Sequence, residues 1–121
     1  MLTSIGKFLR KLRIDQGEIL KDMAEKLEVT VSFLSAVENG KKRMPGAWNK
    51  KICELYQLDK NQRDTFTEAI ADTEESIEIN FRNVTTEHRE LAVSFARKFS
   101  DIDDSQIEEI KKILQGGNRK E

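Results

Sequence analysis

The residues whose chemistry stands out lie on, or just after, one short predicted helix. That helix carries small, non-acidic side chains on one side, and a polar turn with three cations follows it directly. A slim helix of this kind fits the major groove of DNA, and cations at its end can meet phosphates. The candidate DNA-binding residues are Thr30, Val31, Ser32, Ser35, Ala36, Asn39, Lys41, Lys42 and Arg43. The same features also fit an ordinary helical hairpin with a solvated basic turn.

Residues suited to other chemistry are few. His88 is the only histidine and lies near the expected start of a helix, and Cys53, the only cysteine, has no histidine near it in sequence. We find no phosphate-cradling glycine loop, zinc spacing or nucleophile motif. We therefore expect no enzymatic activity, no cofactor and no metal ion, and we interpret Cys53 as a small buried hydrophobe.

Two short helices joined by a tight turn must position the candidate residues. Met23, Ala24 and Leu27 form an apolar stripe on the first helix, and Leu34 and Val37 form one on the second. Helices this short are unstable alone, because nucleation is costly and roughly 12–15 residues is marginal even for good helix formers. Their apolar sides must therefore be covered by neighbouring helices.

A specific set of residues stands in register between Ile5 and about Leu58. The set is Leu12-Arg13, Gly17, Met23-Ala24-Glu25-Lys26-Leu27, Val29-Thr30, Ser32, Leu34-Ser35, Glu38-Asn39-Gly40-Lys41 and Pro45. In these residues the chain resembles the Xre family of helix-turn-helix regulators, the phage Cro and lambda-repressor-like proteins. The resemblance implies a bundle of five helices whose third helix enters the major groove, usually as a homodimer on a two-fold operator.

The resemblance also implies a structural pair and exposes some departures. Arg13 and Glu38 stand where the family pairs an arginine of the first helix with the glutamate that ends the recognition helix. The alternative is two unrelated surface charges. Ile19 and Leu20 replace the usual cap and the phosphate-contacting glutamine of the second helix, and Glu28 replaces the usual turn glycine. These departures put standard operator geometry in doubt without undoing the fold.

Beyond the fifth helix, which we expect to end near Asp72, the pattern changes. Ile77, Ile79 and Phe81 alternate with polar residues, and this alternation predicts a short strand over about 76–82. A lone strand has no partner in its own subunit, so we expect it to pair with a second subunit. The alternative is an extended linker packed on the helices.

The rest of the chain is predicted to form a helical hairpin from two amphipathic helices, over about 86–100 and 104–115. Leu91, Phe95 and Phe99 recur every four residues and give the first of these helices an apolar face. Together with the apolar residues of the predicted strand, they are the candidate dimerisation residues. Residues 116–121 are expected to be a frayed tail.

Charge and composition fit a DNA-binding module with a partner-facing extension. The net charge is only −1, but cations outnumber anions in the first 51 residues and the reverse holds afterwards. A single cysteine, the absence of a signal peptide and the lack of a long apolar run predict a soluble, cytoplasmic protein.

We therefore expect a mainly α chain, a five-helix lambda-repressor-like domain followed by one strand and a helical hairpin. Residues 1–72 would bind DNA and residues 73–115 would join subunits or bind a partner. The predicted function is a sequence-specific regulator of double-stranded DNA, a homodimeric repressor. The alternatives are an antitoxin that binds a toxin and autoregulates its operon, or a protein-interaction module that has lost DNA binding.

Overall fold

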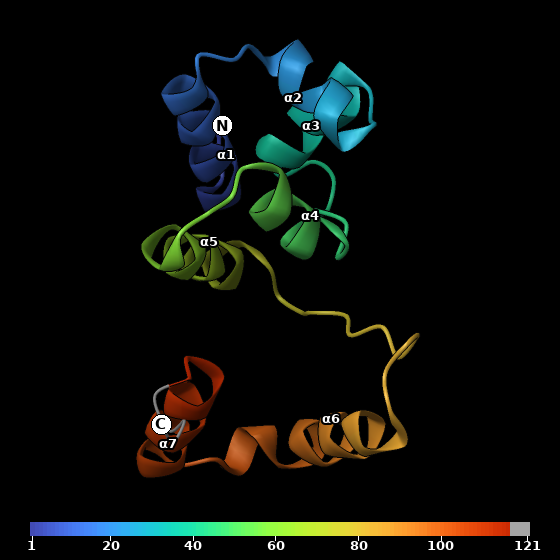
Figure 1. The fold of residues 1–121 in the computed structure, drawn as a ribbon, viewed down its shortest axis with the longest axis vertical. Coiled ribbons are helices and arrows are strands. Elements are labelled where there is room, and N and C mark those ends of the chain that lie inside the picture. The colour runs from blue at the N-terminus through green and yellow to red at the C-terminus, as the bar shows by residue number, and fades with distance from the viewer. Residues whose placement is uncertain (117–121) are drawn as a thin grey trace. The chain divides into compact units, whose positions relative to one another are not determined.

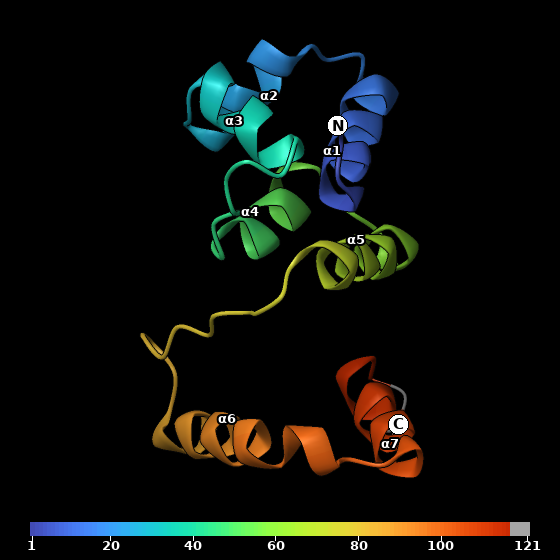
Figure 2. The same ribbon diagram turned by 180° about the vertical axis from the view of Figure 1, so that it is seen from behind.

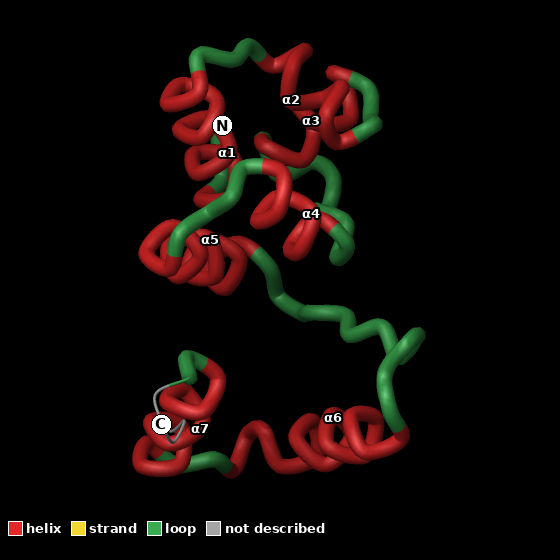
Figure 3. The backbone as a smooth tube through the Cα atoms, in the orientation of Figure 1, coloured by secondary structure: helices red, strands yellow, loops and turns green. Residues whose placement is uncertain are grey.

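The computed structural model describes residues 1–116 of the chain (Figure 1). These residues form seven α-helices and one short 3₁₀ helix, and they divide into two compact units, Met1–Glu78 and the part from Ile79 onward (Figure 3). The elements are α1 (Ser4–Gln16), α2 (Leu20–Leu27), α3 (Val31–Glu38), α4 (Trp48–Leu55), α5 (Lys60–Thr73), α6 (Thr86–Lys98), η1 (Phe99–Asp101) and α7 (Asp104–Leu114). None of these helices is long and apolar enough to cross a membrane.

The first unit holds the five helices α1 to α5, whose buried side chains form one core. Figures 1 and 2 show these helices from two sides. Helix α1 packs along α5 and against α3, while α2 packs against α3 and α4. The core side chains are Ile5, Leu9, Leu12, Met23, Ala24, Leu27, Leu34, Val37, Met44, Trp48, Ile52, Tyr56, Leu58, Phe66 and Ala69. The prediction of a mainly α chain that begins with a bundle of five helices is confirmed.

Local signals in the sequence fix the two ends of α1. The Thr3 hydroxyl accepts a hydrogen bond from the Gly6 N–H at 3.1 Å and so caps the first turn. Gly17 ends the helix at φ 69° and ψ 31°, a left-handed conformation that costs a glycine little. Phe8 on α1 stacks on Phe66 of α5 with ring centroids 4.9 Å apart. This stacking contributes to the contact between the first and last helices of the unit.

Helix α2 has neither a hydrogen-bonding N-cap side chain at its start nor a glycine at its end. Ile19 occupies the N-cap position with no side-chain acceptor, and the Asp22 carboxylate accepts the Ile19 N–H at 2.9 Å. At the other end Glu28 adopts φ 61° and ψ 40°, which L-residues with a Cβ disfavour. The turn between α2 and α3 therefore keeps its shape although a glycine is missing.

The start of α1 lies directly against the end of α3. The Thr3 N–H and hydroxyl both donate to the Glu38 carbonyl, at 3.0 and 3.2 Å. Gly6 makes this approach possible, because a Cβ at this position would lie 2.2 Å from the Glu38 carbonyl oxygen. The packing of these two helices therefore requires a glycine inside α1.

The short strand predicted over residues 76–82 is wrong. Among residues 1–116 no segment forms a β-ladder, and this stretch runs extended until a turn at Arg82-Asn83. There the Arg82 N–H donates to the Asn80 side-chain oxygen at 2.7 Å, and Asn83 adopts φ 61°. The alternating pattern gave the residues a β preference, but a strand needs a neighbouring strand for its backbone groups, and residues 1–116 supply none.

The second unit consists of well-capped helices without a core of their own. The Thr85 hydroxyl accepts the His88 N–H at the start of α6, and the Asp103 carboxylate accepts the Gln106 N–H at the start of α7. No side chain in the described part of this unit is buried. Of the predicted tail, only Gly116 is described, with φ 79°, and residues 117–121 lie outside the described residues.

A Gly6→Ala substitution should destabilise the first unit by about 1–3 kcal/mol, the usual cost of overpacking. The added Cβ would meet the backbone carbonyl of Glu38, so α1 and α3 would have to move apart. In an open helix the same change would stabilise by about 1 kcal/mol, so the sign of the effect is diagnostic. Urea denaturation measures the free energy of unfolding. Gly46→Ala is the control, since nothing lies within 4 Å of its added Cβ, and a stabilised Gly6→Ala variant would contradict the close approach.

Candidate nucleic-acid interface

Helix α3 has one face in the core and one face in solvent. Leu34 and Val37 are buried, whereas Val31 is 41% exposed and Ser32 is exposed as well. Ser35 and Ala36 are half-buried on the same helix and complete the set of small predicted contact residues. The outward face is therefore slim and carries no acidic side chain.

Polar groups of the protein itself satisfy both ends of α3. The Thr30 hydroxyl accepts the Phe33 N–H at 3.0 Å, and the Asn39 side-chain amide donates to the Ser35 carbonyl at 2.9 Å. The backbone N–H groups of Lys41 and Lys42 both donate to the Ala36 carbonyl. These two N–H groups are therefore engaged within the protein.

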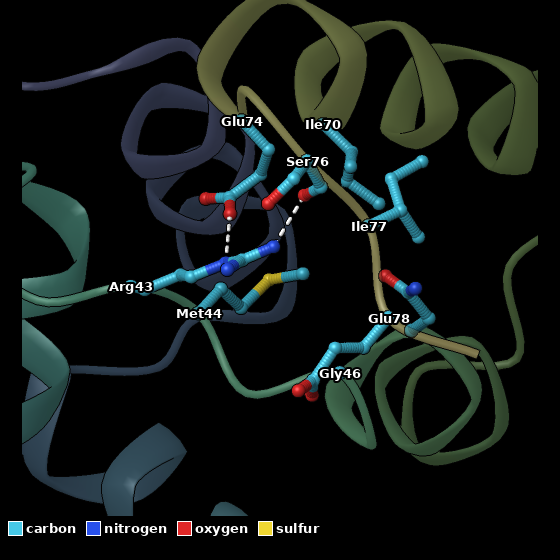
Figure 4. A pocket seen from close by; sticks show the side chains of 9 residues that line it. Arg43, Met44, Gly46, Ile70, Glu74, Ser76, Ile77 and Glu78 are labelled. Atoms are coloured by element: carbon cyan, nitrogen blue, oxygen red, sulfur yellow. Dashed lines mark hydrogen bonds and ion pairs between the residues drawn. The ribbon is translucent and has the colours of Figure 1, made fainter. Parts of the chain in front are cut away.

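The three cations that follow α3 differ in their surroundings. Lys41 and Lys42 are exposed, and neither has an acidic partner among residues 1–116. Arg43, in contrast, donates from Nε to the Glu74 carboxylate at 2.8 Å and from Nη2 to the Ser76 carbonyl (Figure 4). The structure thus leaves two of the three predicted phosphate-binding cations free and engages the third.

A buried ion pair joins Arg13 of α1 to Glu38, the last residue of α3. Its two N–H···O contacts join Nη1 to Oε2 and Nη2 to Oε1, the latter at 3.2 Å. The two side chains are only 9% and 5% exposed. Arg13 Nη1 also lies 3.4 Å from the Met23 sulfur of α2. The guanidinium of α1 therefore contacts side chains of both α2 and α3.

Sequence reasoning missed three residues that position α3 and the basic turn after it. Thr3 and Gly6 hold α1 against the end of α3, and Glu74 engages Arg43. An isolated glycine inside a helical pattern signals close packing, so Gly6 could have been singled out from the sequence. No sequence pattern pointed to Glu74, which lies 31 residues beyond Arg43.

A comparison with protein families identifies the class of this unit. A family model described as a helix-turn-helix domain matches residues 4–66, which is just over half of the chain. The chain belongs to the helix-turn-helix domain family. No curated protein and no solved structure matches it significantly. In the helix-turn-helix unit the motif itself comprises α2, the turn at Glu28-Val29-Thr30 and α3.

The entry to the first helix of the motif is built from an internal network. Glu18 accepts a hydrogen bond from the Tyr56 hydroxyl at 2.7 Å and pairs with Lys26, whose ammonium lies 4.7 Å from the Tyr56 ring centroid. Burial, together with this hydrogen bond, raises the pKa of Tyr56 above its usual range. The network fixes the loop before α2 against α4, and Ile19 beside it is 64% exposed.

The candidate dimerisation residues of the second unit are solvent-exposed. Leu91 and Phe99 are 69% and 63% exposed, and Phe95 contacts Phe99 edge to face with centroids 5.4 Å apart. In the preceding segment Ile77 and Ile79 are exposed and Phe81 is half-buried. Phe81 has the Arg89 guanidinium over its ring, 5.8 Å from the centroid. The structure therefore brings Phe95 and Phe99 together on one apolar face and leaves that face open.

The groups that could bind a metal ion or react as a nucleophile are the acidic side chains, His88 and Cys53. Among residues 1–116 no group of three or more His, Cys, Asp or Glu side chains could hold a metal ion. Cys53 is half-buried, and desolvation raises the pKa of its thiol, which disfavours the reactive thiolate. The exposed polar surface around α3 is therefore the candidate functional site of the helix-turn-helix domain.

Replacing Arg13 with alanine should destabilise the helix-turn-helix domain by about 3–5 kcal/mol, because Glu38 would remain buried and unpaired. Thermal or urea denaturation gives the change. Lys11→Ala is the matched control, since the Lys11–Asp15 pair is exposed and should contribute only about 0–1 kcal/mol. The double variant Arg13→Met, Glu38→Leu should recover much of the loss, since apolar replacement of a buried pair is often near neutral. Equal losses for Arg13→Ala and Lys11→Ala would show that the pair does not hold the helices.

Proposed function

We propose that this protein is a sequence-specific regulator that binds double-stranded DNA, with α3 in the major groove. One observation supports this above the others. The exposed face of α3 is small and free of acidic groups, and Lys41 and Lys42 follow it without acidic partners in the described chain. In proteins of this fold the second helix of the motif lies in the major groove, and DNA-backbone contacts fix its register.

The side chains available to read bases are modest. Ser32 and Ser35 can each form single hydrogen bonds, whereas Val31 and Ala36 can contact only thymine methyl groups. Bidentate readers such as Asn, Gln or Arg are absent from the exposed face of α3. We therefore propose that phosphate contacts and DNA shape supply most of the affinity.

Within this proposal the polar residues that flank α3 have different roles. The side chains of Thr30 and Asn39 are hydrogen-bonded to backbone groups at the two ends of the helix, so they position it beside the DNA backbone. Lys41 and Lys42 remain available to neutralise phosphates. Arg43 joins them only when its contacts with Glu74 and Ser76 open.

We further propose that the regulator is a homodimeric repressor, with residues 1–72 on DNA and residues 73–115 joining the subunits. The exposed apolar face of α6 supports this, because an uncovered cluster of Leu91, Phe95 and Phe99 favours burial against a second chain. A two-fold dimer would present two copies of α3 to successive half-sites of an operator. Occupation of an operator that overlaps a promoter would then repress the gene.

A second candidate function follows from the same exposed surfaces. The second unit has no core among its described residues, so its apolar face would equally suit a different protein, as in an antitoxin that binds a toxin and regulates its own operon. Ile19, exposed where related domains carry a polar cap, also favours a protein-interaction module that has lost DNA binding. Oligomeric state and DNA binding together distinguish these possibilities.

Lys41→Ala should weaken binding to every duplex to a similar extent and lower the salt slope by about one unit, because one phosphate contact is lost. Fluorescence anisotropy over a range of salt concentrations measures this on two probes. One probe is a duplex selected by the wild-type protein from a random pool, and the other is an unselected duplex. Lys60→Ala is the control, because that exposed lysine lies on α5 and pairs with Asp64.

Ser32→Glu tests the groove-facing side of α3 on the same two duplexes, whereas Lys41→Ala tests a phosphate contact. A carboxylate on the exposed face of α3 would be repelled by the groove, so binding to the selected duplex should be abolished while the melting temperature stays unchanged. If Lys41→Ala and Ser32→Glu both bound like the wild type, α3 would not be the DNA face. The interaction-module function would then be the better description.

Phe99→Glu should shift the protein from dimer to monomer in sedimentation velocity, because a carboxylate would enter the apolar face. The helix-turn-helix domain should melt unchanged, since Phe99 is exposed and lies in the other unit. Val93→Glu is the control, because two residues along a helix place Val93 on the opposite side of α6 from Leu91. A wild-type protein that sediments as a monomer would overturn the homodimer.

A further inference from the structure

Arg43 links the basic turn after α3 to the segment that follows α5. Its Nε donates to Glu74 at 2.8 Å, and its Nη2 donates to the Ser76 carbonyl (Figure 4). All three residues belong to the first unit, so this link lies within one compact body. The guanidinium is the group that the basic turn would otherwise offer to a DNA phosphate.

The surroundings of this link bring opposite charges face to face. A hollow between the two segments is lined by Lys41, Lys42 and Arg43 on one side and by Glu74 and Glu75 on the other. Glu74 is the acidic residue that makes the contact, and its side chain is only 13% exposed, against 52% for Arg43. The carboxylate is thus held in place, while the guanidinium that covers it remains accessible from solvent.

We infer that Glu74 competes with DNA phosphate for Arg43, so that the Arg43–Glu74 link is an autoinhibitory clasp. The inference rests on the proposed DNA binding and adds its regulation. Because Arg43 is half exposed, solvent screens its attraction to Glu74, and a phosphate with its matching bidentate geometry can replace the carboxylate.

Opening the clasp has a second consequence. Arg43 also holds the Ser76 carbonyl, so its transfer to a phosphate releases the backbone that leads from α5 into residues 77–85. DNA binding therefore frees the connection between the helix-turn-helix domain and the second unit. The two events share one guanidinium, which couples them.

The clasp is tested first by DNA affinity on an unselected duplex at several salt concentrations. Glu74→Gln removes the negative charge that holds Arg43 and should tighten binding about two- to fivefold, the factor that corresponds to a solvent-screened pair, and raise the salt slope by about one unit. Glu75→Gln removes the same charge from the neighbouring residue, which has no ion-pair partner in the described chain, and should change binding less. Adding Arg43→Ala to Glu74→Gln should abolish the gain. Equal effects of Glu74→Gln and Glu75→Gln would overturn the clasp.

A second measurement needs no DNA. Cleavage by a glutamate-specific protease after Glu75 and Glu78 should be faster in Arg43→Ala than in wild type, while Lys42→Ala should match wild type. Adding duplex to the wild-type protein should accelerate the same cleavages. Unchanged cleavage in Arg43→Ala would overturn the clasp even if DNA binds. If the wild type fails to bind any duplex but Arg43→Ala still speeds cleavage, the link exists and the proposed function fails instead.

Discussion

The contact between α1 and the last residue of α3 is the constraint on which the rest of this structure depends. Glu38 meets α1 twice, through its carboxylate with Arg13 and through its backbone carbonyl with Thr3. Helix α3 has only eight residues and could not persist alone in water. Its existence and its orientation therefore both come from these contacts and from the apolar side chains beneath it. Gly6 is the feature of α1 that lets the two helices approach so closely.

In and around α3, the residues that fix the helix in place differ from those that remain available to a partner. The core takes Leu34 and Val37, and the helix ends take the polar groups of Thr30 and Asn39, so few side chains remain for an external partner. Directly after α3, Lys41 and Lys42 are exposed cations without an acidic partner among residues 1–116. Arg43 is paired with Glu74 of the same unit, and under the proposed DNA binding this pair sets the charge offered to a phosphate.

The second unit, in contrast, has no buried core among its described residues. Its helices have good caps and clear apolar stripes, yet no described side chain in it is buried. Two short helices cannot enclose a core, because too little surface is removed from water to offset the entropy of ordering them. The exposed face of α6 is the physical reason to propose that a second chain covers it.

The sequence by itself determined the helices of the first unit, because caps, apolar periodicity and Gly17 are local signals. The small face of α3 followed from its residue types, and the resemblance to known regulators indicated the Arg13–Glu38 pairing and the helix-turn-helix assignment. Only the tertiary structure decided which groups are free. The N–H groups of Lys41 and Lys42 are hydrogen-bonded to the Ala36 carbonyl. Gly6 lies against Glu38 and Arg43 pairs with Glu74, although these residues are far apart in the sequence. The predicted strand failed for the same reason, because alternation states a residue preference, whereas a strand exists only where a partner backbone is present.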